Sequence, residues 1–191
     1  MTEKNGCATL TIKWTRTALV LPASVRGELS SRVNMLHRYF PEMYLRLKVG
    51  ITHSRSYEAM AFSFDRGFAR LVVRVRRIGT GAWKYPGYGT LAHELMHLAQ
   101  FNSRGIPGGE RAIDIYTLAR LPPKLSDDSP HYLFVPKGPR WKWTHEHARI
   151  AHELALDALE RRSCGLRKYA RWWEDEFERK VGVPSDQGSI F

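Results

Sequence analysis

The segment His93-Glu94-Leu95-Met96-His97 contains the pattern HExxH. On a helix, residues four positions apart lie on the same face, so His93 and His97 can offer two imidazoles to one metal ion. Glu94 lies beside them, where its carboxylate can reach a metal-bound water without being a ligand itself. The pattern therefore predicts a catalytic zinc site with Glu94 as the general base. The alternative is two histidines with ordinary positions on an amphipathic helix.

A catalytic zinc site needs a third protein ligand and leaves one position for water. The best candidate is Glu110, at the start of the next expected helix. Asp114 lies one turn further along and faces the same way. Metal-bound histidines usually donate their second N–H to a carboxylate or a carbonyl, so Asp114 is a natural partner for one of them. The alternative is that Glu110 only stabilises the first turn of its helix as an acidic residue.

A peptidase also profits from a donor that stabilises the oxyanion of the tetrahedral intermediate. Four residues are candidates for this role, namely His147, His145, Tyr132 and Tyr116. His145-Glu146-His147 looks like a fragment of the same motif, but Arg149 occupies the position where a second histidine would be required. For both histidines the alternative is a hydrogen-bonded residue with a structural role.

HELMH followed by a helix that opens with E-x-x-x-D resembles the gluzincins, the thermolysin-type branch of the zincin metallopeptidases. The segment ERAIDIYTLARLPP is also similar to the equivalent helix of the ImmA/IrrE family, a set of compact intracellular zincins. The resemblance implies that His93, His97 and Glu110 bind zinc. It also implies that Glu94 is the base and that Asp114 orients a zinc-bound histidine. The short linker between HExxH and the glutamate points to the minimal members of the group.

Periodicity indicates the elements that must hold these residues. Alternating apolar residues predict strands near 10–14, 45–51, 60–64 and 71–78, and helical spacing predicts helices at about 22–40, 90–104, 110–121, 144–163 and 166–181. The order of strand, helix, three strands and then helices predicts an α+β fold.

The expected architecture is zincin-like, with a small, mostly antiparallel sheet followed by the HExxH helix, the glutamate helix and C-terminal helices. The resemblance covers residues of about 44–121. One domain over residues 1–191 is expected, with a core of about 8–121 and a C-terminal helical part of about 143–181. If the strand at 71–78 lies at the sheet edge, it can hold an extended substrate by strand addition.

Residues 122–142 are Pro-rich and irregular, and they carry the short apolar stretch 132–135. Connections this long without secondary structure are often lids or functional loops. Two placements are open: the stretch lies beside the zinc in the manner of a bound peptide, or it packs on the C-terminal helices.

Composition and charge restrict the class of protein. The 191 residues are 43% hydrophobic and 26% charged, as in a globular chain. No run approaches the roughly 18 apolar residues of a membrane span. No signal peptide is visible, and the two cysteines make a disulfide framework improbable, so a cytoplasmic protein is expected. Residues 1–90 hold 15 Lys and Arg against 5 Asp and Glu, which suits contact with nucleic acid or a solvated basic surface.

The predicted function is that of a zinc-dependent endopeptidase, which hydrolyses peptide or protein substrates with Zn²⁺ as its cofactor. Two alternatives stay open. The first is a DNA-associated regulatory protease, and the second is a catalytically silent, zinc-stabilised nucleic-acid-binding domain. Nothing in the sequence indicates an oligomeric state.

Overall fold

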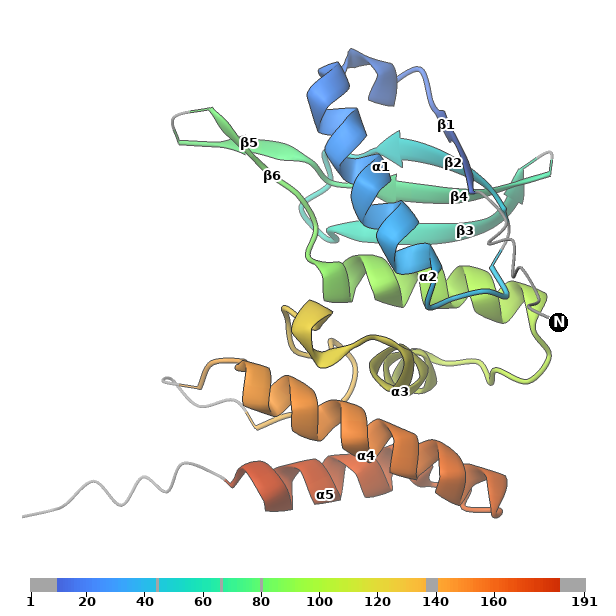
Figure 1. Cartoon of the computed structure of the whole chain (residues 1–191), viewed down its shortest axis with the longest axis vertical. Helices are drawn as coiled ribbons and strands as arrows, with labels where there is room; N and C mark the ends of the chain where they lie inside the picture. Colours follow the sequence, from blue (N-terminus) through green and yellow to red (C-terminus); the bar gives the residue numbers. More distant parts are fainter. Residues whose placement is uncertain (1–9, 44, 66, 80, 137–140, 183–191) are drawn as a thin grey trace, which may run out of the picture. The chain divides into compact units, whose positions relative to one another are not determined.

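The computed structural model describes residues 10–43, 45–65, 67–79, 81–136 and 141–182 (Figure 1). The chain divides into two compact units, and the division passes through helix α2 (Tyr88–Asn102). Unit 1 comprises the chain up to Pro86 together with Glu94–Arg104, and unit 2 comprises Gly87–His93 and the chain from Gly105 onward. The expected single domain stays a prediction.

Unit 1 is built around a four-stranded sheet with the order β1-β2-β4-β3. The strands are β1 (Thr11–Trp14), β2 (Arg46–Ile51), β3 (Ala59–Asp65) and β4 (Phe68–Val73). β1 and β4 run parallel to β2, whereas β3 is antiparallel to β4. The α+β class is confirmed, but the sheet is mixed, so the expectation of a mostly antiparallel sheet was wrong.

Helix α1 (Ala23–His37) explains the parallel pairing of the first two strands. A helical crossover returns the chain to the end of the sheet from which it left, so the strands it joins run in the same direction. α1 lies across one face of the sheet (Figure 1). Its buried stripe and the buried strand residues of that face form the core of unit 1, and they comprise Val25, Leu29, Val33, Leu36, Leu47, Val49, Leu71 and Val73.

The strand expected at 71–78 is two separate strands. β4 ends at Val73, and β5 (Arg76–Ile78) pairs with β6 (Ala82–Lys84) in a second, two-stranded sheet. The alternation of valine and arginine continues across the break, so periodicity could not reveal it. β4 also lies inside the sheet, and β3 is the edge strand on that side. The expectation that residues 71–78 form an edge strand that can bind substrate was therefore wrong.

Unit 2 is helical, with α3 (Glu110–Arg120), the short 3-10 helix η2 (Pro123–Leu125), α4 (His145–Ser163) and α5 (Tyr169–Val181). α3, α4 and α5 contact one another, and their core is built around the fully buried Trp173 and Phe177. These helices begin and end within a few residues of the predicted positions. None of the helices in the described part of the chain is long and apolar enough to cross a membrane.

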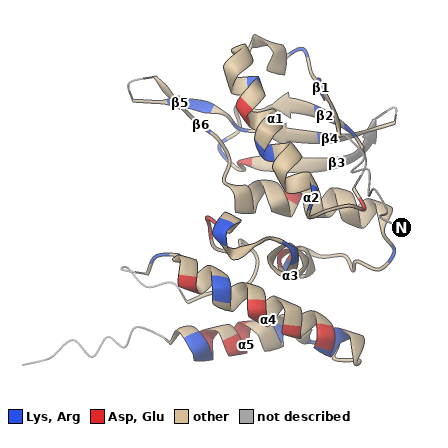
Figure 2. Cartoon of the chain, viewed as in Figure 1, with Lys and Arg blue, Asp and Glu red and all other residues tan. Residues whose placement is uncertain are grey.

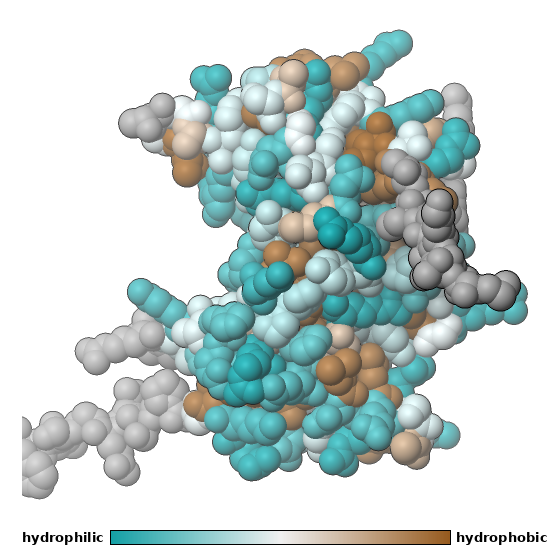
Figure 3. Space-filling view, in the orientation of Figure 1, coloured by the Kyte–Doolittle hydropathy of each residue, from teal (hydrophilic) through white to brown (hydrophobic). Residues whose placement is uncertain are grey.

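Some apolar side chains of the described residues are exposed, among them Leu19, Val20 and Leu156. In the view of Figure 3, the hydrophobic colour of the described residues appears in several separate places between hydrophilic ones. Isolated apolar residues are normal on the surface of a globular protein.

His37 introduces a pH dependence into the stability of unit 1. It is the last residue of α1, it is 7% exposed, and its Nε2 has no hydrogen-bond partner among the described residues. Burial lowers the pKa of His37, because the charged imidazolium loses its hydration. The unfolded chain therefore binds this proton at about pH 6.5, while the folded chain binds it only at lower pH.

We predict that neutral His37 makes its full contribution to the free energy of unfolding above about pH 6.5. This contribution should fall as the pH drops below that value. His37→Leu should remove this part of the pH dependence. The measurement is the free energy of unfolding in urea at about pH 7.5 and about pH 5.5, with a chelator present. The exposed His53 offers a control, because His53→Leu should keep the wild-type dependence. A difference between wild type and His37→Leu that is the same at both pH values would contradict the prediction.

Candidate metal centre

Helix α2 carries the HExxH residues, and its first turn is capped from a distant part of the chain. The carboxylate of Asp127 accepts hydrogen bonds from the backbone N–H groups of Tyr88 and Gly89, both at 2.9 Å. The first N–H groups of a helix have no partner within it, so this cap satisfies two of them. Asp127 lies 38 and 39 positions beyond its partners, so no local sequence pattern announces it. The buried stripe of α2 comprises Leu91, Leu95 and Leu98.

His93 is held between two carboxylates of α3. Asp114 Oδ1 lies 2.7 Å from His93 Nδ1, and Glu110 Oε2 lies 3.0 Å from His93 Nε2. His93 and Asp114 are buried, at 5% and 3% exposed, whereas Glu110 is exposed. Because Asp114 occupies Nδ1, Nε2 is the nitrogen that faces Glu110 and can bind a metal. The contact between Asp114 and a histidine of the motif, expected from the sequence, is present.

The three predicted ligands form a group that could hold a metal ion. His93, His97 and Glu110 each offer one ligand atom, and these atoms all lie within 4.8 Å of one another. The two histidines are one turn apart on α2, and two imidazole nitrogens with one carboxylate oxygen are a donor set that suits zinc. The residues at this position therefore fit a zinc ion.

Glu94, the predicted base, contacts the edge of the sheet. Its Oε2 accepts a hydrogen bond from the backbone N–H of Ala61 at 2.5 Å. Ala61 lies on the edge strand β3 and pairs with Leu71 on the inner side. The backbone N–H of Ala61 that donates to Glu94 is therefore not hydrogen-bonded within the sheet of β3.

The segment 131–136, which we call the strap, is fixed by two buried carboxylates. Asp114 Oδ2 accepts the N–H groups of Tyr132 and Leu133 at 2.7 and 3.1 Å. Glu174 of α5 is 4% exposed, accepts the N–H of Phe134 at 2.9 Å and pairs with Arg111 of α3. Three successive N–H groups of the strap thus have anionic acceptors, although this segment has no regular secondary structure.

The strap packs on the C-terminal helices, which was the second of the two placements considered for it. Leu133 and Val135 are buried in the core of α3, α4 and α5. The ring of Tyr132 stacks on His93, with 5.4 Å between ring centroids and 24° between their planes, and Tyr132 is 52% exposed. Alternate residues therefore pack on the C-terminal helices, while Tyr132 lies against a predicted metal ligand. Its role as an oxyanion donor stays a prediction.

His147 and His145 have other surroundings. His147 forms a capping box with Thr144 at the start of α4, and its ring stacks on Trp141 at 5.0 Å between centroids. His145 is the exposed first residue of α4. In the described part of the chain, no contact joins either histidine to the three predicted ligands. The contacts of His147 fit the structural role that was the alternative to catalysis.

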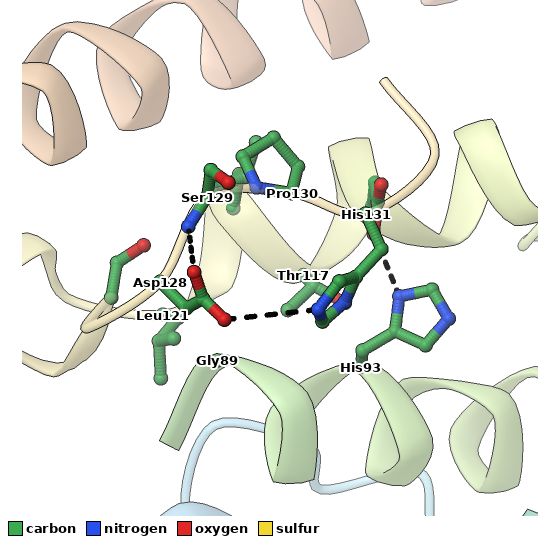
Figure 4. A pocket seen from close by; sticks show the side chains of 11 residues that line it. Gly89, His93, Thr117, Leu121, Asp128, Ser129, Pro130 and His131 are labelled. Carbon is green, nitrogen blue, oxygen red and sulfur yellow. Dashed lines mark hydrogen bonds and ion pairs between the residues drawn. The ribbon is translucent and has the colours of Figure 1, made fainter. Parts of the chain in front are cut away.

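A small cavity lies on the Asp114 side of His93, and Figure 4 shows its lining. It measures about 20 Å³ and is bounded by α3, the start of α2 and residues 126–131. This is room for about one water and too little for a peptide side chain. Thr117 Oγ1, which is buried and has no hydrogen-bond partner among the described residues, is the group that such a water would pair.

Comparison with known proteins identifies no relative. No protein-family model matches the chain, and neither a curated protein nor a solved structure matches it. The relation to the gluzincins therefore stays a prediction, which rests on the motif and on the positions of the residues described above.

We predict that Asp114→Asn weakens zinc binding by about 10- to 100-fold, the usual cost of losing such a partner. An amide cannot accept from both strap N–H groups and also accept from the imidazole, because one of its two atoms is a donor. Zinc affinity should be measured by competition with a chelator. The matched control is Asp157→Asn, which changes an exposed carboxylate on α4 and should leave the affinity unchanged. Equal affinities in Asp114→Asn and wild type would show that Asp114 does not orient the ligand.

A second prediction concerns the cap of α2. Asp127→Ala should lower the free energy of unfolding by about 0.5–2 kcal/mol, because two N–H groups of the first turn lose their acceptor. The neighbouring Asp128→Ala is the control and should cost less than about 0.5 kcal/mol, because the equally exposed Asp128 caps no helix and contacts only the adjacent Ser129 N–H and the exposed His131. Gly87→Ala provides a further check, since an added Cβ would lie 3.0 Å from the Asp127 carboxylate. Similar stabilities for the two Asp variants would contradict the assignment.

Proposed function

We propose that the chain is a zinc-dependent peptidase of the zincin type, which hydrolyses peptide bonds with a metal-activated water. One observation carries the proposal: His93, His97 and Glu110 offer ligand atoms within 4.8 Å of one another. A group of three protein ligands is the number that catalytic zinc sites use, whereas structural sites are usually closed by four. The observation thus favours a catalytic ion over a structural one.

The residues around the group have the properties that this reaction requires. Zinc, when bound, lowers the pKa of its water and polarises the scissile carbonyl. Glu94 takes the proton of the attacking water and passes it to the leaving amine. The hydrogen bond from Ala61 to Oε2 orients this carboxylate. Asp114 keeps the His93 ring in the orientation in which Nε2 faces the metal.

The edge strand β3 supplies a means of binding an extended peptide. Its outer N–H and C=O groups are not used within the sheet, and Ala61 on this strand donates to Glu94. A peptide that adds to the outer edge of β3 forms main-chain hydrogen bonds beside the proposed base. This assigns to β3 the role that the sequence had suggested for residues 71–78.

The decisive variants separate metal binding from catalysis. Glu94→Gln should retain about one zinc per chain and lose peptide hydrolysis by about 10²–10⁴-fold, because the amide cannot take the proton. His93→Ala and His97→Ala should lose the metal itself. Zinc content is measured by atomic absorption, and hydrolysis by mass spectrometry of unstructured protein substrates.

Two results would refute this function. One is a Glu94→Gln protein that hydrolyses substrate at the wild-type rate. The other is wild-type zinc affinity in Glu110→Ala, which would remove Glu110 from the ligand set and require another third ligand. Asp157→Asn is a suitable control for both, because this exposed carboxylate lies on α4 and outside the metal group.

A further inference from the structure

The face of the sheet opposite α1 has an unusual composition. Side chains alternate between the two faces of a strand, and most of the buried strand residues lie on the face that α1 covers. The other face carries Lys13 on β1, Arg46 and Lys48 on β2, Phe68 and Arg70 on β4, and Phe62 on β3. We call these six residues the basic face. The register also pairs Asp65 of β3 with Phe68.

The register of the strands places the cations directly opposite one another. Lys13 is paired with Lys48, and Lys48 is in turn paired with Arg70. Three cations of neighbouring strands thus lie in one row across the sheet. Such a row gives this face a positive potential, which attracts an anionic ligand.

Aromatic rings lie between these cations. Lys13 Nζ and Arg46 Cζ lie 4.9 and 4.2 Å from the centre of the Phe68 ring. Arg70 pairs with Phe62 in the register and lies over its ring at 5.9 Å. Phe62 is 40% exposed, which is high for a phenylalanine in a sheet. An exposed ring beside Arg and Lys side chains is a surface on which a nucleic-acid base can stack.

The charge continues past the carboxyl ends of the parallel strands β2 and β4. There an open cleft of about 440 Å³ is lined by Thr52, His53, Arg55, Arg74, Val75 and Arg76. Glu58 pairs with Arg74 at 3.0 Å, and no carboxylate lines the cleft itself. Figure 2 shows the wider contrast, with Asp and Glu frequent along α4 and α5 and rare on the strands.

We infer that the basic face of the sheet binds single-stranded nucleic acid, with phosphates on its cations and a base stacked on Phe62. The cations supply the sequence-independent attraction, and the aromatic rings select strands whose bases are unpaired. In a duplex the faces of the bases are stacked on one another, so they are not available to stack on an exposed phenylalanine. The site contains none of the residues of the metal group, so it does not depend on the proposed peptidase activity.

The test measures the anisotropy of labelled oligothymidine and oligouridine strands with the full chain, over a range of salt concentrations. Duplex DNA of equal length and vesicles rich in anionic lipid are the competing ligands. We expect the single strands to bind more tightly than either competitor. The binding constant should fall with salt, and each phosphate contact contributes a slope of about 0.7 in the logarithmic plot.

A triple variant tests the charges. Lys13→Gln/Arg46→Gln/Arg70→Gln should lower the affinity by at least about tenfold and reduce the salt slope by about 2. The control changes three exposed cations of unit 2, Arg167→Gln/Lys168→Gln/Lys180→Gln, with the same loss of net charge. The control should keep most of the wild-type affinity and slope.

Phe62 tests stacking without any change of charge. Phe62→Ala should weaken binding by about 5- to 150-fold and leave the salt slope unchanged. Phe62→Tyr should restore the affinity, which also excludes a loss of folding as the cause. Unchanged affinity in Phe62→Ala, an equal loss in the control triple variant, or equal binding of duplex or vesicles would each overturn the inference.

Discussion

The carboxylate of Asp114 joins three parts of unit 2. One oxygen holds the imidazole of His93, and the other accepts two N–H groups of the strap. A carboxylate that is 3% exposed would be costly without partners, and these three hydrogen bonds offset the lost hydration. The orientation of the predicted metal ligand and the path of the strap therefore depend on the same buried charge. A change at Asp114 cannot affect one without affecting the other.

Positive charge is unevenly distributed over the chain. Most of the net charge of +11 comes from residues 1–90, and the structure concentrates cations on one face of the sheet and in the cleft at its end. The predicted metal group uses carboxylates instead, and two buried acids, Asp114 and Glu174, hold the strap. Buried acids are unfavourable for folding unless a partner compensates for the charge. Asp114 and Glu174 find that partner within the chain, in the strap N–H groups, His93 and Arg111.

Local patterns predicted the parts of the structure whose contacts are local. The i, i+4 spacing of His93 and His97 places both on one face of α2, and helical periodicity located all the long helices. Strand pairing was predicted less well, since it depends on which distant segments meet; the mixed sheet and the break after Val73 illustrate this. Asp127 and the strap contacts were missed for the same reason. They join residues 18 to 40 positions apart and follow no repeat.

The C-terminal helices belong to the support of the predicted metal ligand, although the motif resemblance ended before them. The carboxylate of Asp114 that holds His93 also accepts the N–H groups of Tyr132 and Leu133 through its second oxygen. Leu133 is fixed in turn by the core that α3 shares with α4 and α5, and the next N–H of the strap is bound by Glu174 on α5. The chain of contacts from His93 through Asp114 and the strap thus ends in packed side chains more than 60 positions away. A site that reads as a five-residue motif in the sequence is therefore held in place by much of unit 2.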